Sequence, residues 1–225
     1  MATQSARSIS WVVFDLGGVI IRIHHSWQEA AVAAGVFAAN ISKHDLARRP
    51  MLDPTQHRAD DFQKLISAHQ RGILPHEDFC KGVSELTAGL VSTQDVARIH
   101  KSVIVGAYDG AEQLLQDLKV RGISTACLSN TNHQHWEIMR DISAFTAIQH
   151  RHASHLFQLE KPNQAIFRAF ESATQARPVD ILYFDDLVEN IAAATHAGWS
   201  AELIDPNCET VPQIRHALET HGVLL

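Results

Sequence analysis

A short apolar run that ends in one carboxylate and a pair of glycines constrains this chain more than any other feature. Trp11 to Phe14 is uninterrupted and apolar, as a buried parallel strand would be, and Asp15 follows it directly. Open α/β sheets bind their ligands beyond the carboxyl ends of such strands. Gly17 and Gly18 leave room for a ligand to approach the backbone, whose N–H groups can hold an anion. The segment predicts a strand ending in a ligand-binding loop, although taken alone it fits a turn-capping aspartate equally well.

The second half of the chain has the rhythm of a parallel sheet. Beyond residue 105, short apolar runs alternate with segments of helical periodicity, which predicts an α/β fold built from βαβ units. One run, residues 123–128, ends at Ser129 and Asn130, small polar residues that can cap a helix and bind an anion at its N-terminus. Other expected elements are a helix capped by Asp109 and Glu112, a helix opened by Lys161 and Pro162, a strand over 200–204 and a helix over 209–220.

A second apolar run ends in two adjacent carboxylates. Residues 181–184 are apolar and lead directly into Asp185 and Asp186. Neighbouring carboxylates repel one another unless protonation or a cation relieves the repulsion. A hard divalent cation with oxygen ligands is the economical solution, and Mg²⁺ fits that ligand set best. The sequence therefore predicts a magnesium site where this strand ends.

Residues 26–104 have a different sequence pattern from the rest of the chain. They carry helical periodicity interrupted by glycine and proline, with no convincing strand. We therefore expect a helical cap over 26–104, inserted between the first two sheet strands of an α/β core made of residues 1–25 and 105–225. An insertion at that point would overhang the strand ends, where it could exclude water and choose the substrate.

Composition narrows the possible partners and location. The chain has 225 residues, 45% of them hydrophobic, so it can bury a large core without disulfides. Its net charge is −6 and it has no basic run, which argues against nucleic acid as a partner. Three widely spaced cysteines, a polar N-terminus and the lack of a long apolar stretch predict a cytoplasmic protein with no signal peptide and no membrane segment. A monomer and a homodimer are equally compatible with the sequence.

Four motifs taken together resemble a known family. They are Asp15 after an apolar strand, Ser129-Asn130 after the next, Lys161-Pro162, and Asp185-Asp186 with Asn190. In this order and spacing they resemble the motifs of the haloacid dehalogenase superfamily of hydrolases, over essentially the whole chain. The wording Phe-Asp-Leu-Gly-Gly-Val, Leu-Ser-Asn-Thr-Asn and Phe-Asp-Asp-x-x-x-Asn is most similar to its subfamily I branch of α-D-glucose-1-phosphate phosphatases. The resemblance implies a doubly wound, Rossmann-like parallel sheet in the order 5-4-1-2-3, with a helical cap after strand 1.

The resemblance also implies an activity and a cofactor. The activity is Mg²⁺-dependent hydrolysis of a small phosphorylated metabolite, with a sugar phosphate favoured. Asp15 would attack phosphorus to form an aspartyl phosphate, which water then hydrolyses. Mg²⁺ would be held by Asp15, the Gly17 carbonyl and Asp186, with Asp185 orienting bound water or completing the shell.

The remaining motif residues would bind the phosphoryl group. Ser129 and Lys161 join Asp15 as the catalytic residues that the resemblance implies. The phosphoryl oxygens would be held by Ser129, the Asn130 N–H, Lys161 and the backbone at Gly17 and Gly18. Donors fixed in advance around such a group are worth about 3–4 kcal/mol each in related electrostatic sites.

One position departs from the family pattern. Most phosphatases of this superfamily carry an aspartate two residues after the nucleophile, which protonates the leaving group, but here the residue is Gly17. General acid–base catalysis contributes about 10²–10⁴-fold, so its loss suits an acidic leaving group such as an anomeric hydroxyl or an acyl group. His24 and His25 follow the loop and are candidate substitutes. Two alternatives stay open: a catalytically silent phosphate-binding or regulatory member, which Gly17 permits, and a metal-independent dehalogenase, which Asp185 and Asp186 disfavour.

Fifteen histidines raise the question of a second metal site. The groups that suggest one most are His133 with His135, and His150 with His152 and His155. Residues two apart on a helix point to different faces, and no cysteine or carboxylate set completes four ligands. We therefore predict that these histidines lie at the surface or are hydrogen-bonded within the fold.

Overall fold

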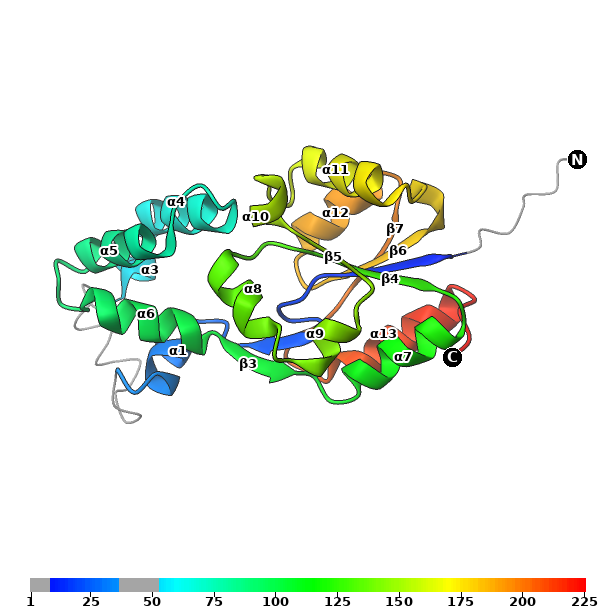
Figure 1. Ribbon diagram of the computed structural model, residues 1–225, viewed down its shortest axis with the longest axis horizontal. Coiled ribbons are helices and arrows are strands. Elements are labelled where there is room, and N and C mark those ends of the chain that lie inside the picture. Colours follow the sequence, from blue (N-terminus) through cyan, green and yellow to red (C-terminus); the bar gives the residue numbers. More distant parts are fainter. Residues whose placement is uncertain (1–8, 37–52) are drawn as a thin grey trace, which may run out of the picture.

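A parallel five-stranded sheet forms the centre of the molecule (Figure 1). The structure is a computed structural model that describes residues 9–36 and 53–225. The strand order is β5-β4-β1-β6-β7, and every neighbouring pair is parallel. The strands are β1 (Trp11–Phe14), β4 (Ser124–Ser129), β5 (His150–Ala153), β6 (Ile181–Asp185) and β7 (Ser200–Leu203).

Helices cover both faces of this sheet, as the alternation of buried side chains requires. On one face Val12 and Phe14 of β1 pack with α7 (Ala111–Val120), α9 (Ser143–Ala147) and α13 (Thr210–Thr220). On the other face Val13 packs with α11 (Gln164–Thr174) and α12 (Val188–His196). Figure 1 shows the two layers, with α11 and α12 on the opposite side of the sheet from α7 and α13. The predicted α/β class is therefore confirmed.

Two short strands that the sequence did not reveal form a separate antiparallel pair. β2 (Ile21–Ile23) pairs with β3 (Ile104–Ala107) beside the main sheet. These strands have only three and four residues, too few to show a period. Because β2 and β3 lie outside the main sheet, the strand labels differ from those of the expected order. If only the five strands of the main sheet are numbered along the chain, the order read from β7 to β5 is 5-4-1-2-3.

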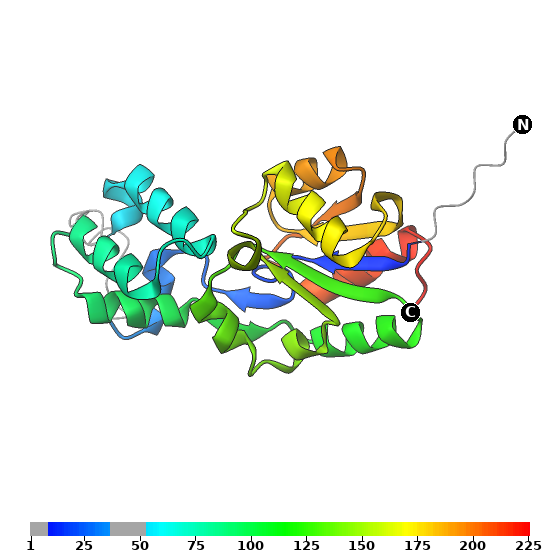
Figure 2. The ribbon, with the colours of Figure 1, turned by 45° about the horizontal axis from the view of Figure 1, so that its top comes forward.

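The segment between β2 and β3 forms its own helical cluster, here called the helical unit (residues 27–36 and 53–102). It contains α1 (Trp27–Ala33), α3 (Pro54–His57), α4 (Ala59–Gln70), α5 (His76–Leu86) and α6 (Thr93–Ser102). Phe62, Phe79, Val83 and Ile99 are buried in a hydrophobic cluster of this unit alone. Figure 2 shows the unit as a distinct body at one end of the sheet, joined to it through the β2–β3 pair.

Two helix starts lie away from their predicted positions. α7 begins at Ala111 with Gly110 as its N-cap, so Asp109 does not cap it; Gly110 adopts the left-handed φ of 79° that the turn needs. α11 begins at Gln164, where Asn163 accepts a hydrogen bond from the Ala165 N–H, rather than at Pro162. Both errors are of one or two residues. The described residues also form α8 (His133–Met139), α10 (Ser154–Phe157) and a short 3-10 turn over Pro178–Asp180.

None of the helices in the described ranges combines the length and the apolar character that crossing a bilayer requires.

Candidate active site

Three neighbouring strands bring the predicted residues to one edge of the sheet. β4, β1 and β6 lie side by side, and Phe14 of β1 is in register with Phe184 of β6. Ser129 and Asp185 end their strands, and Asp15 directly follows its own. Because parallel strands end at the same edge, these three side chains meet there although they are more than fifty residues apart in the sequence.

Lys161 joins these strand ends from the loop before α11. Its N–H donates to Asn130 Oδ1, and the Asn130 amide donates back to the Lys161 carbonyl, both at 2.9 Å. The lysine side chain is fully buried, and its Nζ lies 3.2 Å from Asp15 Oδ1 and 2.6 Å from Asp185 Oδ2. Asn130 thus fixes the lysine backbone while the two carboxylates fix its charge.

Asp185 is the most completely satisfied of the carboxylates. Besides Lys161, its oxygens accept hydrogen bonds from the Tyr183 hydroxyl, from the Asn190 amide at 3.0 and 3.1 Å and from the Leu187 N–H at 2.9 Å. Tyr183 was missed in the sequence because it reads there as one more residue of an apolar strand. With so many partners, Asp185 is built to hold Lys161 in place.

Mutual neutralisation explains how these charges tolerate burial. Burial alone would lower the pKa of Lys161, but the charges of Asp15 and Asp185 reverse this effect and raise it. Burial would likewise raise the pKa of Asp185, yet Lys161 and hydrogen bonds bring it below its ordinary value. For Asp15 burial outweighs the attraction of Lys161, so its pKa is raised. Lys161 therefore stabilises the ionised form of Asp185 more than that of Asp15.

Asp186 is different, because no lysine or arginine in the described ranges forms an ion pair with it. Burial, together with the charges of Asp15 and Asp185, raises the pKa of Asp186 to about 7. Oxygen atoms of these three carboxylates lie within 4.8 Å of one another. A hard divalent cation would relieve this repulsion and takes such oxygen ligands, so the donor set fits Mg²⁺.

The two loop glycines have different roles. The Gly18 N–H, expected from the sequence to face an anion, donates to the Ile21 carbonyl at 2.9 Å. Gly18 is needed for another reason: its φ is +77°, and a Cβ there would lie 2.5 Å from Asp186 Oδ2. Gly17 lines the pocket, and its N–H has no hydrogen-bond partner among the described residues, so it remains available to an anion.

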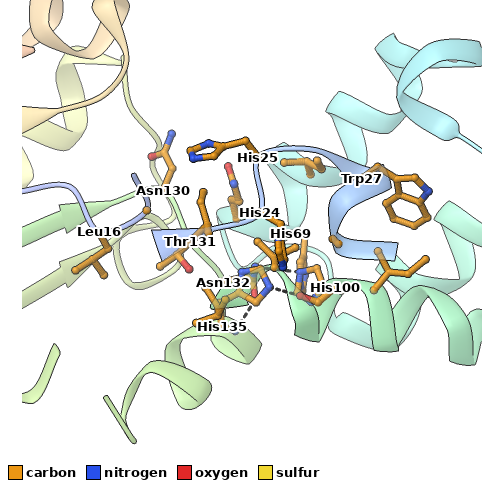
Figure 3. Close-up of a pocket in the computed structure, with 18 of the residues that line it drawn as sticks. Leu16, His24, His25, Trp27, His69, His100, Asn130, Thr131, Asn132 and His135 are labelled. Carbon is orange, nitrogen blue, oxygen red and sulfur yellow. Dashed lines mark hydrogen bonds between the residues drawn. The ribbon is translucent and has the colours of Figure 1, made fainter. Parts of the chain in front are cut away.

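A pocket of about 340 Å³ lies beside this edge of the sheet, between the sheet loops and the helical unit (Figure 3). The sheet side contributes Gly17, Ser129 and Asn130, and the helical unit contributes Gln63 and Ile66 among others. His24 and His25, expected near the loop from the sequence, also line the pocket. Four further polar side chains line it: His69, His100, Asn132 and His135.

Of the five histidines singled out in the sequence, His133 and His155 are in ring contact, with centroids 4.4 Å apart. His133 and His150 are exposed and His152 is half-buried. His135 and His155 are buried: His135 donates from Nε2 to the His100 carbonyl at 2.7 Å, and His155 Nδ1 lies 3.2 Å from the Thr131 carbonyl. Burial lowers the pKa of each of these two to about 4, so both rings are neutral.

Comparison with known proteins places this arrangement in a family. Residues 9–198 match the haloacid dehalogenase-like hydrolases. A HAD-family enzyme of Bacteroides thetaiotaomicron, solved with magnesium and inorganic phosphate, is 20% identical, with a TM-score of 0.70 over 92% of this chain and 100% of that one. A predicted HAD-like hydrolase of Porphyromonas gingivalis is 22% identical, with a TM-score of 0.70 over 93% and 98%. L-2-haloacid dehalogenase of Xanthobacter autotrophicus, with chloropropionic acid covalently bound, is 16% identical, with a TM-score of 0.61 over 87% and 77%. At these identities the likeness is one of fold.

Proposed function

The chain belongs to the haloacid dehalogenase-like hydrolases, and from this premise we propose that it is a Mg²⁺-dependent phosphomonoesterase acting through an aspartyl phosphate. The observation that supports the proposal most is the cluster of Asp15, Asp185 and Asp186, in which Lys161 pairs with Asp15 and Asp185 but not with Asp186. A dehalogenase releases a halide and needs no metal, so an unbalanced third carboxylate would only oppose its chemistry. A phosphatase brings a dianion to the same place and needs the cation.

Asp15 is the proposed nucleophile. Its carboxylate attacks phosphorus, the bond from phosphorus to the ester oxygen breaks, and the leaving oxygen takes up a proton. Water then attacks the aspartyl phosphate, which releases inorganic phosphate and restores Asp15. The Leu16 N–H donates to Asp15 Oδ1 at 2.7 Å and orients the carboxylate. Mg²⁺, when bound by Asp15, Asp186 and the Gly17 carbonyl, supplies charge neutralisation between nucleophile and phosphate.

Lys161 and Ser129 are the proposed phosphate ligands on the protein side. Lys161 Nζ already contacts Asp15 at 3.2 Å, so it lies next to the reacting carboxylate and can bridge it to a phosphoryl oxygen. Ser129 is buried, and a hydrogen bond from its hydroxyl to Asp15 stabilises the ionised form. The free N–H of Gly17 adds a third donor. Such donors, fixed before the reaction, cost no reorganisation when charge develops.

The leaving group is proposed to be a comparatively acidic one. Gly17 offers no carboxylic acid, and we propose His24 and His25, which follow the loop and line the pocket, as the groups that could replace it. An anomeric hydroxyl or an acyl group departs with less need for a proton than an ordinary alcohol does. Within this class we favour a sugar 1-phosphate of the kind hydrolysed by the glucose-1-phosphatase branch.

The helical unit is the proposed cap that chooses the substrate. It supplies one wall of the pocket through residues such as Gln63 and Ile66, whereas the carboxylates lie on the sheet. A small phosphorylated metabolite would therefore place its phosphate against the sheet and its leaving group against the helices.

The test is phosphate release by the purified protein, with and without Mg²⁺, over a panel that includes glucose 1-phosphate, glucose 6-phosphate and acetyl phosphate. We expect Mg²⁺-dependent turnover with a preference for glucose 1-phosphate or acetyl phosphate over glucose 6-phosphate. Asp15→Asn should abolish turnover, while Asp180→Asn, a surface carboxylate, serves as the matched control. Acid-quenched protein should carry a hydroxylamine-sensitive phosphate on Asp15.

A silent phosphate-binding member is the second candidate, and the absence of an acid at Gly17 favours it. It predicts that phosphate and Mg²⁺ bind together, measurable by calorimetry, with no phosphoenzyme and no turnover. Release of chloride from 2-chloropropionate without Mg²⁺ would instead support a dehalogenase.

A further inference from the structure

Three histidines of the helical unit converge on one point away from the carboxylates. His69 lies in the last turn of α4, His76 opens α5 and His100 lies in the last turn of α6. Their ring centroids form a nearly equilateral triangle with sides of 5.7, 5.2 and 5.1 Å. One nitrogen of each ring lies within 4.8 Å of a nitrogen of the other two. Three helices thus meet at three imidazoles.

Two of these rings carry a buried nitrogen that nothing satisfies. His69 Nδ1 lies 2.8 Å from the Leu74 carbonyl and must donate to it, which leaves Nε2 as a bare lone pair. His69 Nε2 and His100 Nδ1 are buried and have no hydrogen-bond partner within the part of the chain that the structure describes. Both residues are more than nine-tenths buried, with exposed fractions of 4% and 8%. Buried polar atoms normally have hydrogen-bond partners, so two unsatisfied ring nitrogens in one triangle point to a ligand-binding site.

We propose that His69, His76 and His100 form a binding site for a transition-metal ion of the Zn²⁺ type, separate from the carboxylate site. Neutral imidazole is a preferred ligand of Zn²⁺, Co²⁺, Ni²⁺ and Cu²⁺, whereas Mg²⁺ selects oxygen. Nitrogen ligands of one tetrahedral ion at about 2.0–2.1 Å lie about 3.4 Å apart, a distance that small ring rotations from the present geometry can reach. Three protein ligands leave a fourth position for water.

The surroundings of two ligands fit this role. A metal-binding histidine usually donates its second N–H to a carbonyl, as His69 does to Leu74. For His100, binding through Nδ1 places the ring proton on Nε2, which lies 3.3 Å from Asn132 Nδ2. A half-turn of the Asn132 amide then presents its oxygen to that proton and gives up its bonds to the His135 N–H and to His135 Nδ1. Asn132 is therefore a positioning residue for the loaded site.

The third ligand can turn to complete the site. His76 is half-buried, and the Cys80 thiol lies 3.6 Å from its Nε2. A thiol is a weak donor, so turning this ring toward an ion gives up little. Because His76 is at the start of α5 and is partly exposed, an ion can also enter from this side.

The site also makes structural sense for the helical unit. Its ligands come from α4, α5 and α6, the helices that wall one side of the pocket with residues such as Ile66 and Ile99. An ion held by all three would brace this wall. The same three helices otherwise meet through a compact apolar cluster and a few rings, including His69 stacked on Phe79 at 4.5 Å.

The test is Zn²⁺ binding by the metal-stripped full chain, measured by calorimetry in excess Mg²⁺, so that the carboxylate site is occupied. We expect one equivalent of Zn²⁺ to bind, and Co²⁺ to give the visible absorption of a tetrahedral nitrogen site. His76→Gln and His69→Gln should weaken binding at least about tenfold, since each removes a ligand. His76→Cys restores a ligand and should recover binding. His196→Gln removes an exposed histidine on α12 and is the matched control.

Thermal unfolding with and without Zn²⁺ gives a second measure of binding. It does not depend on enzyme activity, and the metal-free midpoint shows whether a variant folds normally. Zn²⁺ should raise the midpoint of unfolding of the wild type and of His196→Gln, but not that of His76→Gln, which should otherwise unfold like the wild type without metal. Loss of Zn²⁺ binding in Asp186→Asn with normal binding by His76→Gln would overturn the proposal, because the ion would then sit on the carboxylates. Equal affinity of wild type and both histidine variants would overturn it as well.

Discussion

The buried Lys161 depends on a particular set of anions. Its side chain has no exposed surface, and its charge is balanced by Asp185 at 2.6 Å and Asp15 at 3.2 Å. Removing one partner of a buried ion pair costs about 3–5 kcal/mol, because the remaining charge stays desolvated. The arrangement therefore couples the stability of the fold to the geometry of the site.

Asp185→Asn tests this coupling. We expect the free energy of unfolding in urea to fall by about 3–5 kcal/mol, together with loss of phosphatase activity as Lys161 is no longer fixed. Asp180→Asn breaks the exposed pair with Arg177 and should leave the unfolding midpoint nearly unchanged. Equal stability of wild type and Asp185→Asn would contradict the role assigned to Asp185.

His155 makes stability depend on pH. Its folded-state pKa is lowered by burial, and further by His133 and His69, from 6.5 to about 4. Between these values the unfolded chain binds a proton that the folded chain does not, so stability is complete above pH 6.5 and is lost as the pH falls toward 4. The loss is at most about 3 kcal/mol. In His155→Gln the decline between pH 6.5 and 4 should be shallower, and an NMR titration of the wild-type ring should give a midpoint well below 6. A midpoint near 6.5 would remove the basis of this prediction.

At the scale of elements, one serine joins the helical unit to the loop after β4. Ser154, buried at the start of α10, accepts a hydrogen bond from the Thr131 N–H at 2.9 Å, and its hydroxyl lies 2.6 Å from the Gln70 carbonyl at the end of α4. The Ser129–Thr131 segment that is proposed to hold phosphate is therefore tied to the position of α4.

Ser154→Ala should weaken this connection between α4 and the loop after β4. Leaving the buried Thr131 N–H and Gln70 carbonyl without a partner costs about 1–3 kcal/mol of unfolding free energy. We also expect kcat/KM to fall, because the loop that binds phosphate is less well fixed. Ser143→Ala, which removes an exposed hydroxyl at the start of α9, is the control and should change neither quantity.

Elements with a strong pattern were predictable from the sequence, and those whose ends depend on tertiary contacts were not. The apolar runs Trp11–Phe14 and 181–184 are strands as expected, because burial on both faces demands continuous apolar residues. The start of α11 was misplaced because both Pro162 and Asn163 are good helix openers, and only the bond from Ala165 decides between them. β2 and β3 were missed because each is stabilised by the other, across eighty residues of intervening chain.

At the scale of the whole molecule, two bodies wall one pocket. The sheet carries the carboxylates and Lys161, while the helical unit lines the opposite wall of the pocket. Residues on the helical wall should therefore affect only substrates whose leaving group reaches them.

Gln63→Ala examines this division. Gln63 is exposed and lines the pocket, so its loss should leave folding intact. We expect KM for the preferred phosphomonoester to rise several-fold while hydrolysis of acetyl phosphate, which has a small leaving group, is unchanged. Lys64→Ala changes the next residue, which pairs with Asp61 at the surface, and should affect neither substrate. An equal effect of Gln63→Ala on both substrates would place this residue outside leaving-group recognition.

Long-range assembly sets the limit of what the sequence could reveal about the sites. Asp15, Lys161 and the Asp185–Asp186 pair could be predicted because each follows a recognisable local pattern. The histidine triangle could not, because His69, His76 and His100 come from three helices whose packing no short pattern encodes.

The place of the missing general acid is not vacant. A Cβ on Gly17 would lie 3.1 Å from Ile23 Cδ1, so the β2 side chain occupies the space into which an aspartate would grow. Restoring the acid by Gly17→Asp alone should strain the loop, whereas the same change beside Ile23→Ala should be accommodated. Positions 17 and 23 are therefore coupled: a lineage that gains the acid at position 17 must also make room for it at the isoleucine.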